Sequence, residues 1–237
     1  MYKSIKYIIP YSISYLMDKY FQNGFFINLE HRKDRLAGVQ IELAKVGLSG
    51  LERFNAIKMA NGAVGCTMSH IKCLQLAKER GWSHVIVVED DIVFTDAPLF
   101  LKQFGTFMES GREWDVIILG GNNNGRYTKI DDCCVQVTSC QTTTGYIVNG
   151  HYIDTLLKNF TDGLNLLLKY PDKHLFYAID RYWFYLQKQD KWFLIIPQSV
   201  VQAPNYSDIE KKNTDYRNAM TMLDKSSRTK FPPIVYR

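Results

Sequence analysis

Short apolar runs separated by polar segments organise the first half of the chain. The runs 25–29 (Phe-Phe-Ile-Asn-Leu) and 85–88 (Val-Ile-Val-Val) are rich in β-branched and aromatic residues, and they predict buried strands. Between them, apolar residues recur every three or four positions over 33–48, which predicts an amphipathic helix. These alternating strands and helices predict an α/β fold with a parallel sheet of the nucleotide-binding type.

The same patterns predict the remaining elements. Further helices are expected over 66–80, from Asp96 and Pro98 onward, over 151–160 and over about 178–188; further strands are expected over 53–56, 115–119, 133–138, 145–148 and 192–196. Two glycine-containing stretches, 61–65 and 120–125, predict loops or turns. The second half mixes short strands and helices.

Length and charge set the domain organisation. A chain of 237 residues can bury one sizeable core, so we expect an extension over 1–23 that packs on the domain, one domain over 24–210, and a basic tail over 211–237. From residue 210 onward seven basic residues outnumber three acidic ones, which accounts for most of the net charge of +5. Such a tail can touch an anionic membrane surface or a polyanionic substrate, but basic tails are more often simply solvated.

The cysteines and the apolar runs predict the compartment. Five cysteines, two of them adjacent and none in CxxC spacing, argue against a disulfide framework or a zinc site. Reduced thiols in a cytoplasmic protein account better for this cysteine pattern. Cys66 and Cys73 share a helical face, and we expect both to be small core residues. No apolar run reaches the roughly 18 residues of a membrane span, and the N-terminal residues lack a signal-peptide pattern. We expect a cytoplasmic protein, with at most peripheral membrane contact.

Three consecutive carboxylates, Glu89-Asp90-Asp91, follow the predicted strand 85–88. An isolated acidic triplet is most often a solvated turn. In α/β sheets, however, ligands bind at the carboxyl ends of strands, and carboxylate oxygens suit Mg²⁺ or Mn²⁺. The position of the triplet therefore favours a binding site for a divalent cation that bridges a diphosphate.

Two other polar segments follow predicted strands. The stretch 28–35 brings basic side chains to the start of a helix, where they either bind a nucleotide or form a solvated charged run. It contains no GxGxxG or GxxxxGK[ST] pattern, which disfavours a dinucleotide or P-loop site. In the stretch 65–70, Ser69 and His70 point about 100° apart on a helix and cannot form a catalytic dyad. A binding role at the helix start or a hydrogen-bonded core histidine remains.

These motifs occur in one order that resembles glycosyltransferase family 25, which includes lipopolysaccharide and lipooligosaccharide galactosyltransferases and collagen β-galactosyltransferases. The resemblance covers about residues 24–210. The motifs that carry it lie at 25–35, 65–70, 89–94, 145–148 (Gly-Tyr-Ile-Val), 179–180 (Ile-Asp) and 207–209 (Ser-Asp-Ile). The first two are specific, whereas Glu-Asp-Asp alone is not.

The resemblance implies a GT-A fold, with a single mixed, mostly parallel central sheet flanked by helices. It also implies an enzyme that moves a hexose, galactose or glucose, from a UDP-sugar to a glycan or protein hydroxyl, with Mn²⁺ or Mg²⁺ and with inversion. By correspondence Asp91 becomes the direct metal ligand, supported by Glu89, while Asp90 helps to hold the ribose and a metal-bound water. The other nucleotide-sugar-binding positions are Asn28, Arg32, Arg35, Ala56, Ser69 and His70.

The late part of the chain departs from the family pattern. No histidine follows residue 174 to act as the late metal ligand of many GT-A enzymes. Gln202 or Asp208 would take that place, or the diphosphate and water would complete the coordination shell. Tyr146, Trp183 and Tyr206 are candidates to stack on sugar rings, although each residue type is also common in cores.

Inversion requires a carboxylate that takes the proton of the acceptor hydroxyl. We expect Asp180 in this role, because its apolar and aromatic neighbours would desolvate it and raise its pKa. The alternative is that Asp180 caps its helix or pairs with Arg181.

A second class of function is a non-catalytic nucleotide-sugar or glycan-binding protein on the same fold. A nucleotidyltransferase is disfavoured, since no Gly- and Lys-rich signature lies near the first strand. We expect no nucleic-acid partner. The sequence leaves the donor sugar, the acceptor and the oligomeric state open.

Overall fold

The computed structural model describes residues 19–207 and 212–225. Asp208, most of the predicted N-terminal extension and almost half of the basic tail lie outside the described residues. Phe21, near the end of the predicted extension, is buried, and its ring centroid lies 5.0 Å from that of Phe104. No helix in the described ranges is both long and apolar enough to cross a membrane.

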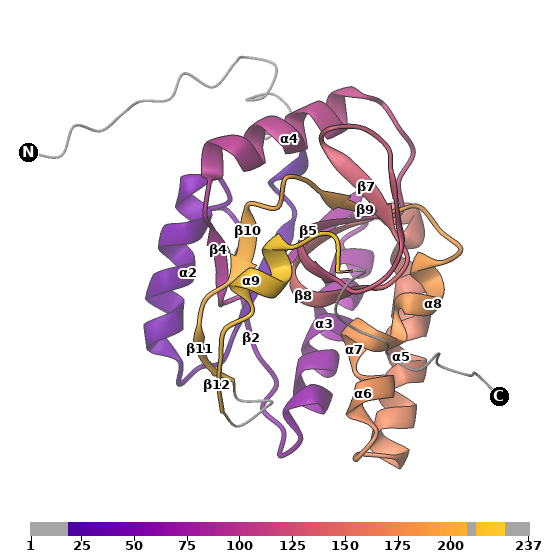
Figure 1. Ribbon diagram of the computed structural model, residues 1–237. Coiled ribbons are helices and arrows are strands. Elements are labelled where there is room, and N and C mark those ends of the chain that lie inside the picture. Colours follow the sequence, from indigo (N-terminus) through magenta and orange to yellow (C-terminus); the bar gives the residue numbers. More distant parts are fainter. Residues whose placement is uncertain (1–18, 208–211, 226–237) are drawn as a thin grey trace, which may run out of the picture.

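An eight-stranded central sheet forms the middle layer (Figure 1). Its order is β2-β1-β3-β8-β5-β9-β7-β6. The strands are β1 (Gly24–Asn28), β2 (Glu52–Asn55), β3 (His84–Glu89), β5 (Val116–Asn123), β6 (Tyr127–Lys129), β7 (Cys134–Val137), β8 (Cys140–Asn149) and β9 (Trp192–Ile195).

The sheet is mixed because β8 inserts between β3 and β5. It runs antiparallel to both, and Tyr146 lies opposite Val87 on one side and Ile118 on the other. The pairings of β1 with β2, β1 with β3 and β5 with β9 are parallel, so that all strands except β8 and β7 point the same way. The predicted α/β class with a mixed, mostly parallel central sheet is confirmed.

Helices cover both faces of the sheet (Figure 1). Helices α2 (Lys33–Lys45) and α4 (Ala97–Glu109) pack on one face, and α3 (Gly62–Glu79) and α5 (Ile153–Lys169) on the other. Successive strand residues point to opposite faces, as in β3, where Ile86 and Val88 meet the first pair of helices and Val85 and Val87 meet the second. Each face of the sheet therefore has its own apolar core, and the polar ends of the strands lie outside both cores.

The remaining elements are short. They are β4 (Ile92–Phe94), η1 (Gly150–Tyr152), α6 (His174–Tyr177), α7 (Ile179–Tyr182), α8 (Phe184–Gln187), β10 (Val200–Gln202), β11 (Asn205–Ser207), β12 (Lys212–Thr214) and α9 (Arg217–Thr221). Strand β10 pairs with β4, and β11 pairs with β12 in a hairpin.

Three sequence-based predictions of local structure are wrong. The glycine-rich stretch from residue 120 is not a loop: β5 continues to Asn123, because Asn122 pairs with Gln141 of β8. The helix expected at 66–80 begins at Gly62, where the Asn61 side chain accepts a hydrogen bond from the Ala63 N–H at 3.0 Å. The helix expected over 178–188 is broken into α7 and α8.

Candidate functional site

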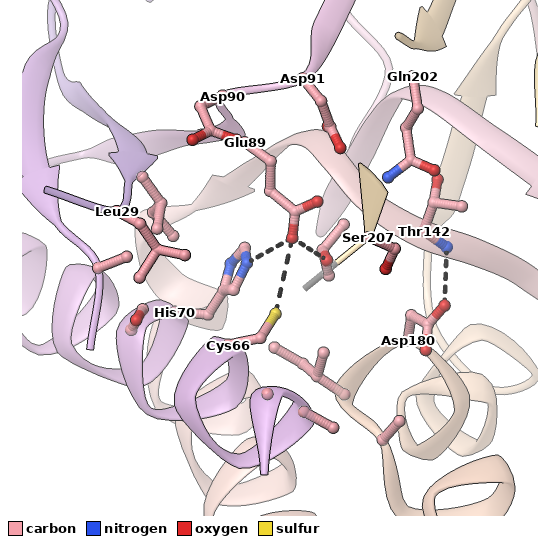
Figure 2. A pocket seen from close by; sticks show the side chains of 18 of the residues that line it. Leu29, Cys66, His70, Glu89, Asp90, Asp91, Thr142, Asp180, Gln202 and Ser207 are labelled. Atoms are coloured by element: carbon pink, nitrogen blue, oxygen red, sulfur yellow. Dashed lines mark hydrogen bonds and ion pairs between the residues drawn. The ribbon is translucent and has the colours of Figure 1, made fainter. Parts of the chain in front are cut away.

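A pocket of about 530 Å³ opens at the carboxyl ends of β1 and β3 (Figure 2). The strands bring together the side chains that the sequence separates. Those that the argument below uses are Arg35, Ala56, Cys66, Ser69, His70, Glu89, Asp90, Asp91, Thr142, Thr143, Asp180 and Gln202. This is the edge at which α/β sheets bind ligands, as the position of the acidic triplet predicted.

Glu89, the last residue of β3, is held from below by three donors. Its Oε1 accepts a hydrogen bond from Thr143 Oγ1 at 2.7 Å and lies 3.2 Å from His70 Nε2 and 3.6 Å from Cys66 Sγ. Burial raises its pKa, but these donors, above all His70, outweigh burial and hold the pKa below its ordinary value. Glu89 is therefore an ionised carboxylate fixed at the floor of the pocket.

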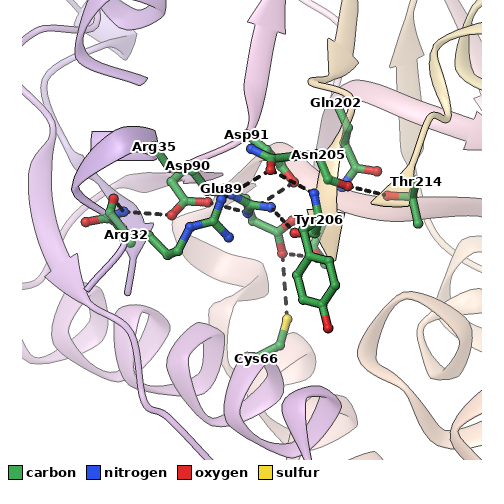
Figure 3. A network of polar contacts seen from close by, with 12 residues as sticks. Arg32, Arg35, Cys66, Glu89, Asp90, Asp91, Gln202, Asn205, Tyr206 and Thr214 are labelled. Carbon is green, nitrogen blue, oxygen red and sulfur yellow. Dashed lines mark hydrogen bonds and ion pairs between the residues drawn. The ribbon is translucent and has the colours of Figure 1, made fainter. Parts of the chain in front are cut away.

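Asp90 is clamped between Asn28, the last residue of β1, and Arg35 in the first turn of α2. Figure 3 shows its contact with Arg35. Its Oδ1 accepts from Arg35 Nη1 at 2.9 Å, and its Oδ2 accepts from Asn28 Nδ2 at 2.7 Å. Asn28 in turn accepts a hydrogen bond from Arg53 Nε at 3.1 Å. The carboxylate of Asp90 is thus positioned by the end of β1 and the start of α2.

Asp91 is the least satisfied of the three carboxylates. Its Oδ1 is buried and has no hydrogen-bond partner among the described residues, and its Oδ2 lies 3.6 Å from Arg35 Nη1. Burial, and next the charge of Glu89, raise the pKa of Asp91 to about 8. A buried carboxylate oxygen without a partner, beside two other carboxylates, is the environment that a hard divalent cation would satisfy. The residues present fit such an ion.

The residues predicted to hold the nucleoside divide into two groups. Arg35 and Ala56 line the pocket, whereas Asn28 and Arg32 lie behind its lining and contact protein atoms. Arg32 donates to Asp34 at 3.1 Å and to Asn205 Oδ1 of β11 at 3.3 Å. We therefore assign Asn28 and Arg32 to positioning Asp90 and β11, and leave Arg35 and Ala56 as ligand-contacting candidates.

Ser69 and His70 sit on α3 with their side chains engaged. Ser69 Oγ accepts from the Ile57 N–H at 2.9 Å and donates to the Gly65 carbonyl at 2.8 Å, so it fixes the loop after β2. His70 Nδ1 lies 2.8 Å from Tyr146 Oη, and a carboxylate can only accept, so His70 presents Nε2–H to Glu89. The histidine connects the pocket floor to the core.

The aromatic candidates for sugar stacking are corrected by the structure. Tyr146 and Trp183 are fully buried, and their rings pack edge to face with centroids 5.8 Å apart. Neither ring lines the pocket. Both act in the core because β8 is a central strand covered on that face by helices. Of the three, only Tyr206 is exposed, at 43%.

Asp180 faces the pocket from the first turn of α7 (Figure 2). Its Oδ2 accepts a hydrogen bond from the Thr142 N–H at 3.2 Å, and burial raises its pKa, the direction that the sequence predicted. The described contacts include no ion pair with Arg181, although that charge opposes the rise. Thr142 has φ = 75°, a strained conformation for a β-branched residue, and this conformation presents its N–H to Asp180.

The late segment closes the pocket on the side opposite α3. Gln202 of β10 lines it, as do Asn205 and Ser207 of β11. Arg35 Nη2 donates to the Tyr206 carbonyl at 2.9 Å and so attaches this segment to the carboxylates (Figure 3). Gln202 stays a candidate late ligand, while Asp208 lies beyond the described residues.

Sequence reasoning missed Cys66, Thr142 and Thr143. Cys66 was assigned to the core, yet it is half-buried and lines the pocket. Its spacing of four from His70 places both side chains on one helical face, which was a usable signal. No sequence signal marks the two threonines, because only the antiparallel insertion of β8 brings them to Glu89 and Asp180.

The family comparison supports an enzyme that transfers sugars. Residues 51–143 match the sequence profile of glycosyltransferase family 25, described as an LPS biosynthesis protein. This stretch contains β2, α3, the three carboxylates and the strained Thr142. A search of curated proteins found no match.

Solved structures with a related arrangement are distant in sequence. A mannose-1-phosphate geranyltransferase from Thermus thermophilus is 12% identical, with 73% of each chain covered and a TM-score of 0.43. A glycosyltransferase involved in glycosylation of the major capsid of PBCV-1 is 9% identical, over 84% of this chain and 88% of that one, with a TM-score of 0.43. A Drosophila β-1,4-galactosyltransferase 7 mutant in complex with manganese, UDP-Gal and xylobiose is 10% identical, over 56% and 50%, with a TM-score of 0.33.

Proposed function

We propose that this glycosyltransferase, whose residues 51–143 match family 25, transfers a hexose from a UDP-sugar to a glycan or protein hydroxyl, with a divalent cation and with inversion. One observation carries the proposal: the buried, unpartnered Oδ1 of Asp91 beside Glu89 and Asp90 in a pocket of about 530 Å³. Pockets of this size accommodate drug-sized and cofactor-sized ligands.

The carboxylates divide the work of donor binding. Asp91 would hold Mn²⁺ or Mg²⁺ directly, with Glu89 in support, and such an ion supplies Lewis-acid charge for a departing diphosphate. Both carboxylate oxygens of Asp90 accept hydrogen bonds, one from Arg35 and one from Asn28. The role of Asp90 is therefore to orient these two side chains. Arg35 remains at the pocket wall and provides a guanidinium for the donor phosphates.

Asp180 is the base in this proposal. It must accept the proton of the acceptor hydroxyl, and its raised pKa makes it a stronger base than an exposed aspartate. The hydrogen bond from the Thr142 N–H fixes Oδ2, which orients the carboxylate before the acceptor binds. Because α7 and the carboxylates lie on different walls of the pocket, the base and the donor site are supplied by separate elements.

The test is UDP release from a panel of UDP-sugars, with and without glycan acceptors, in Mn²⁺ and in EDTA. We expect turnover with at least one UDP-hexose that is lost in EDTA and restored by Mn²⁺. Donor binding by calorimetry without turnover of any donor would instead favour the non-catalytic binding protein. Turnover that survives EDTA undiminished would contradict the metal requirement.

A further inference from the structure

The floor of the pocket carries a mixed sulfur, nitrogen and oxygen cluster on two elements. Cys66 and His70 lie one turn apart on α3, and Glu89 ends β3. One ligand atom from each, Sγ, an imidazole nitrogen and a carboxylate oxygen, lies within 4.8 Å of the others. We infer that these three residues form a second metal site, selective for a thiophilic divalent cation such as Zn²⁺ or Co²⁺. Glu89 is the one residue that it shares with the cation site proposed at Asp91.

The separations suit a tetrahedral ion. Zn²⁺ bonds of about 2.0–2.3 Å place neighbouring ligand atoms roughly 3.5 Å apart. His70 Nε2 lies 3.2 Å from Glu89 Oε1, and Cys66 Sγ lies 3.6 Å from the same oxygen. Sγ and the imidazole nitrogen lie within 4.8 Å of each other. An ion among these three atoms takes the place of the thiol and Nε2 hydrogens that now point at Glu89.

The surrounding contacts orient the three ligands. A metal-binding histidine usually has its second ring nitrogen held by a polar partner, and His70 Nδ1 lies 2.8 Å from Tyr146 Oη. Thr143 Oγ1 donates to Glu89 at 2.7 Å and fixes the carboxylate in the same way. A sulfur ligand favours Zn²⁺, Co²⁺ or Cd²⁺ over the hard ions Mg²⁺ and Mn²⁺.

The site is open on one side only. All three residues line the pocket, so the fourth coordination position faces the pocket space, where water or a ligand can enter. On binding, the Cys66 thiol transfers its proton to solvent. The proton on His70 Nε2 moves to Nδ1, which then donates to Tyr146 Oη, so His70 stays neutral while Glu89 stays ionised. The pocket floor thereby gains one net positive charge.

A second cluster meets the same distance criterion but already contains a cation. Asp131, Cys133 and Cys134 lie together, and the Arg112 guanidinium pairs with Asp131 and donates to Cys134 Sγ at 2.8 Å. Arginine therefore occupies the place that a metal ion would take. The Cys66 cluster contains no such cation among the described residues.

The experiment titrates the metal-free protein with Co²⁺ and records its absorption spectrum. We expect one equivalent to produce thiolate-to-cobalt charge-transfer absorption in the near ultraviolet. Cys66→Ser should abolish it, whereas Cys73→Ser on the same helix, Cys134→Ser in the second cluster and Asp91→Asn should retain it. Absence of the band in the wild type, or its persistence in Cys66→Ser, would overturn the inference.

A second measurement needs no variant. Cys66 is half-buried while the other four cysteines are buried, so a maleimide should label Cys66 first, as located by mass spectrometry. We expect Zn²⁺ to slow this labelling at least about ten-fold and Mg²⁺ to leave it unchanged. Equal labelling with and without Zn²⁺ would refute the site. Neither readout requires turnover, so both stand apart from the test of the proposed function.

Discussion

Three adjacent carboxylates in this protein occupy three different environments. Glu89 is surrounded by donors, Asp90 is clamped by Arg35 and Asn28, and Asp91 keeps a buried oxygen without a partner. The pKa of Glu89 is lowered, and those of Asp90 and Asp91 are raised mainly by burial. The residue with the largest rise in pKa is the one placed to meet a cation.

The raised pKa of Asp91 predicts how stability depends on pH. Its pKa lies at about 8 in the folded protein and 3.8 as the reference for the unfolded chain, so the folded state binds the extra proton more tightly between these values. The contribution of Asp91 to stability therefore falls as pH rises from about 4 to 8 and levels off above. In EDTA, Asp91→Asn should be more stable than wild type at pH 8 by ~1–3 kcal/mol, measured by urea unfolding.

The difference should shrink towards pH 5, where wild-type Asp91 is protonated. Asp172→Asn, an exposed residue, serves as the control and should leave the pH profile unchanged. Parallel pH profiles of wild type and Asp91→Asn would contradict the assigned environment of Asp91.

Asp180 is predicted to act on the chemical step alone. Asp180→Asn keeps the size of the side chain and an oxygen that accepts from Thr142 N–H, but it cannot take a proton. Turnover should fall by about 10²–10⁴-fold, while donor affinity measured by calorimetry stays at the wild-type value. Full activity of Asp180→Asn would show that the base lies elsewhere.

At the scale of elements, β8 supports the site from the end at which it begins. Thr142 donates to Asp180, Thr143 donates to Glu89, and Tyr146 contacts His70. These contacts exist because β8 runs antiparallel between β3 and β5, which places its first half at the carboxyl ends of its neighbours. A parallel strand in the same place would have put these residues at the other edge of the sheet.

Helix α3 can approach the segment after β2 closely only because residue 65 is glycine. A Cβ at Gly65 would lie 2.4 Å from the Ile57 carbonyl oxygen, a contact that the backbone must move to avoid. Gly65→Ala should therefore destabilise the protein by ~2–4 kcal/mol in urea unfolding. It should also weaken donor binding, since the displaced loop includes Ala56.

A matched glycine shows what the contact contributes. Gly38 lies within α2, and a Cβ there would meet nothing within 4 Å. Gly38→Ala should stabilise the protein by ~0.5–1 kcal/mol, because alanine has the higher helix propensity. If both substitutions changed stability alike, the close approach at Gly65 would not be the cause.

At the scale of the whole molecule, the pocket joins segments from Ile27 to Tyr216. In the described part of the basic tail, Arg217 pairs with Asp215 at 2.7 Å and Lys225 donates to the Asn123 carbonyl at 2.8 Å.

The lining of the pocket includes residues of the first strand and of the late hairpin. A ligand that fills the pocket would contact both, and it should stabilise the fold as a unit.

Ligand binding should therefore raise the melting temperature. UDP with Mn²⁺ at about 100 times its dissociation constant contributes about 2.7 kcal/mol, which for a chain of this size corresponds to roughly 5–10 °C. Mn²⁺ alone or UDP with EDTA should give a much smaller shift, and Asp91→Asn should reduce the shift with both. An equal shift for UDP in EDTA would argue against donor binding through a metal.

The sequence by itself determined the local elements and the chemistry. Periodicity placed most strands and helices, and Glu89-Asp90-Asp91 identified the end of the sheet at which the pocket opens, because a strand followed by carboxylates is a local pattern. Only the tertiary structure decided what each group does. Burial left Asp91 with an oxygen that has no partner, whereas both oxygens of its neighbour Asp90 accept hydrogen bonds. The insertion of β8 brought Thr142 and Thr143 to the site, and close packing placed Tyr146 in the core. These outcomes depend on contacts between residues far apart in the chain, which spacing along the sequence does not encode.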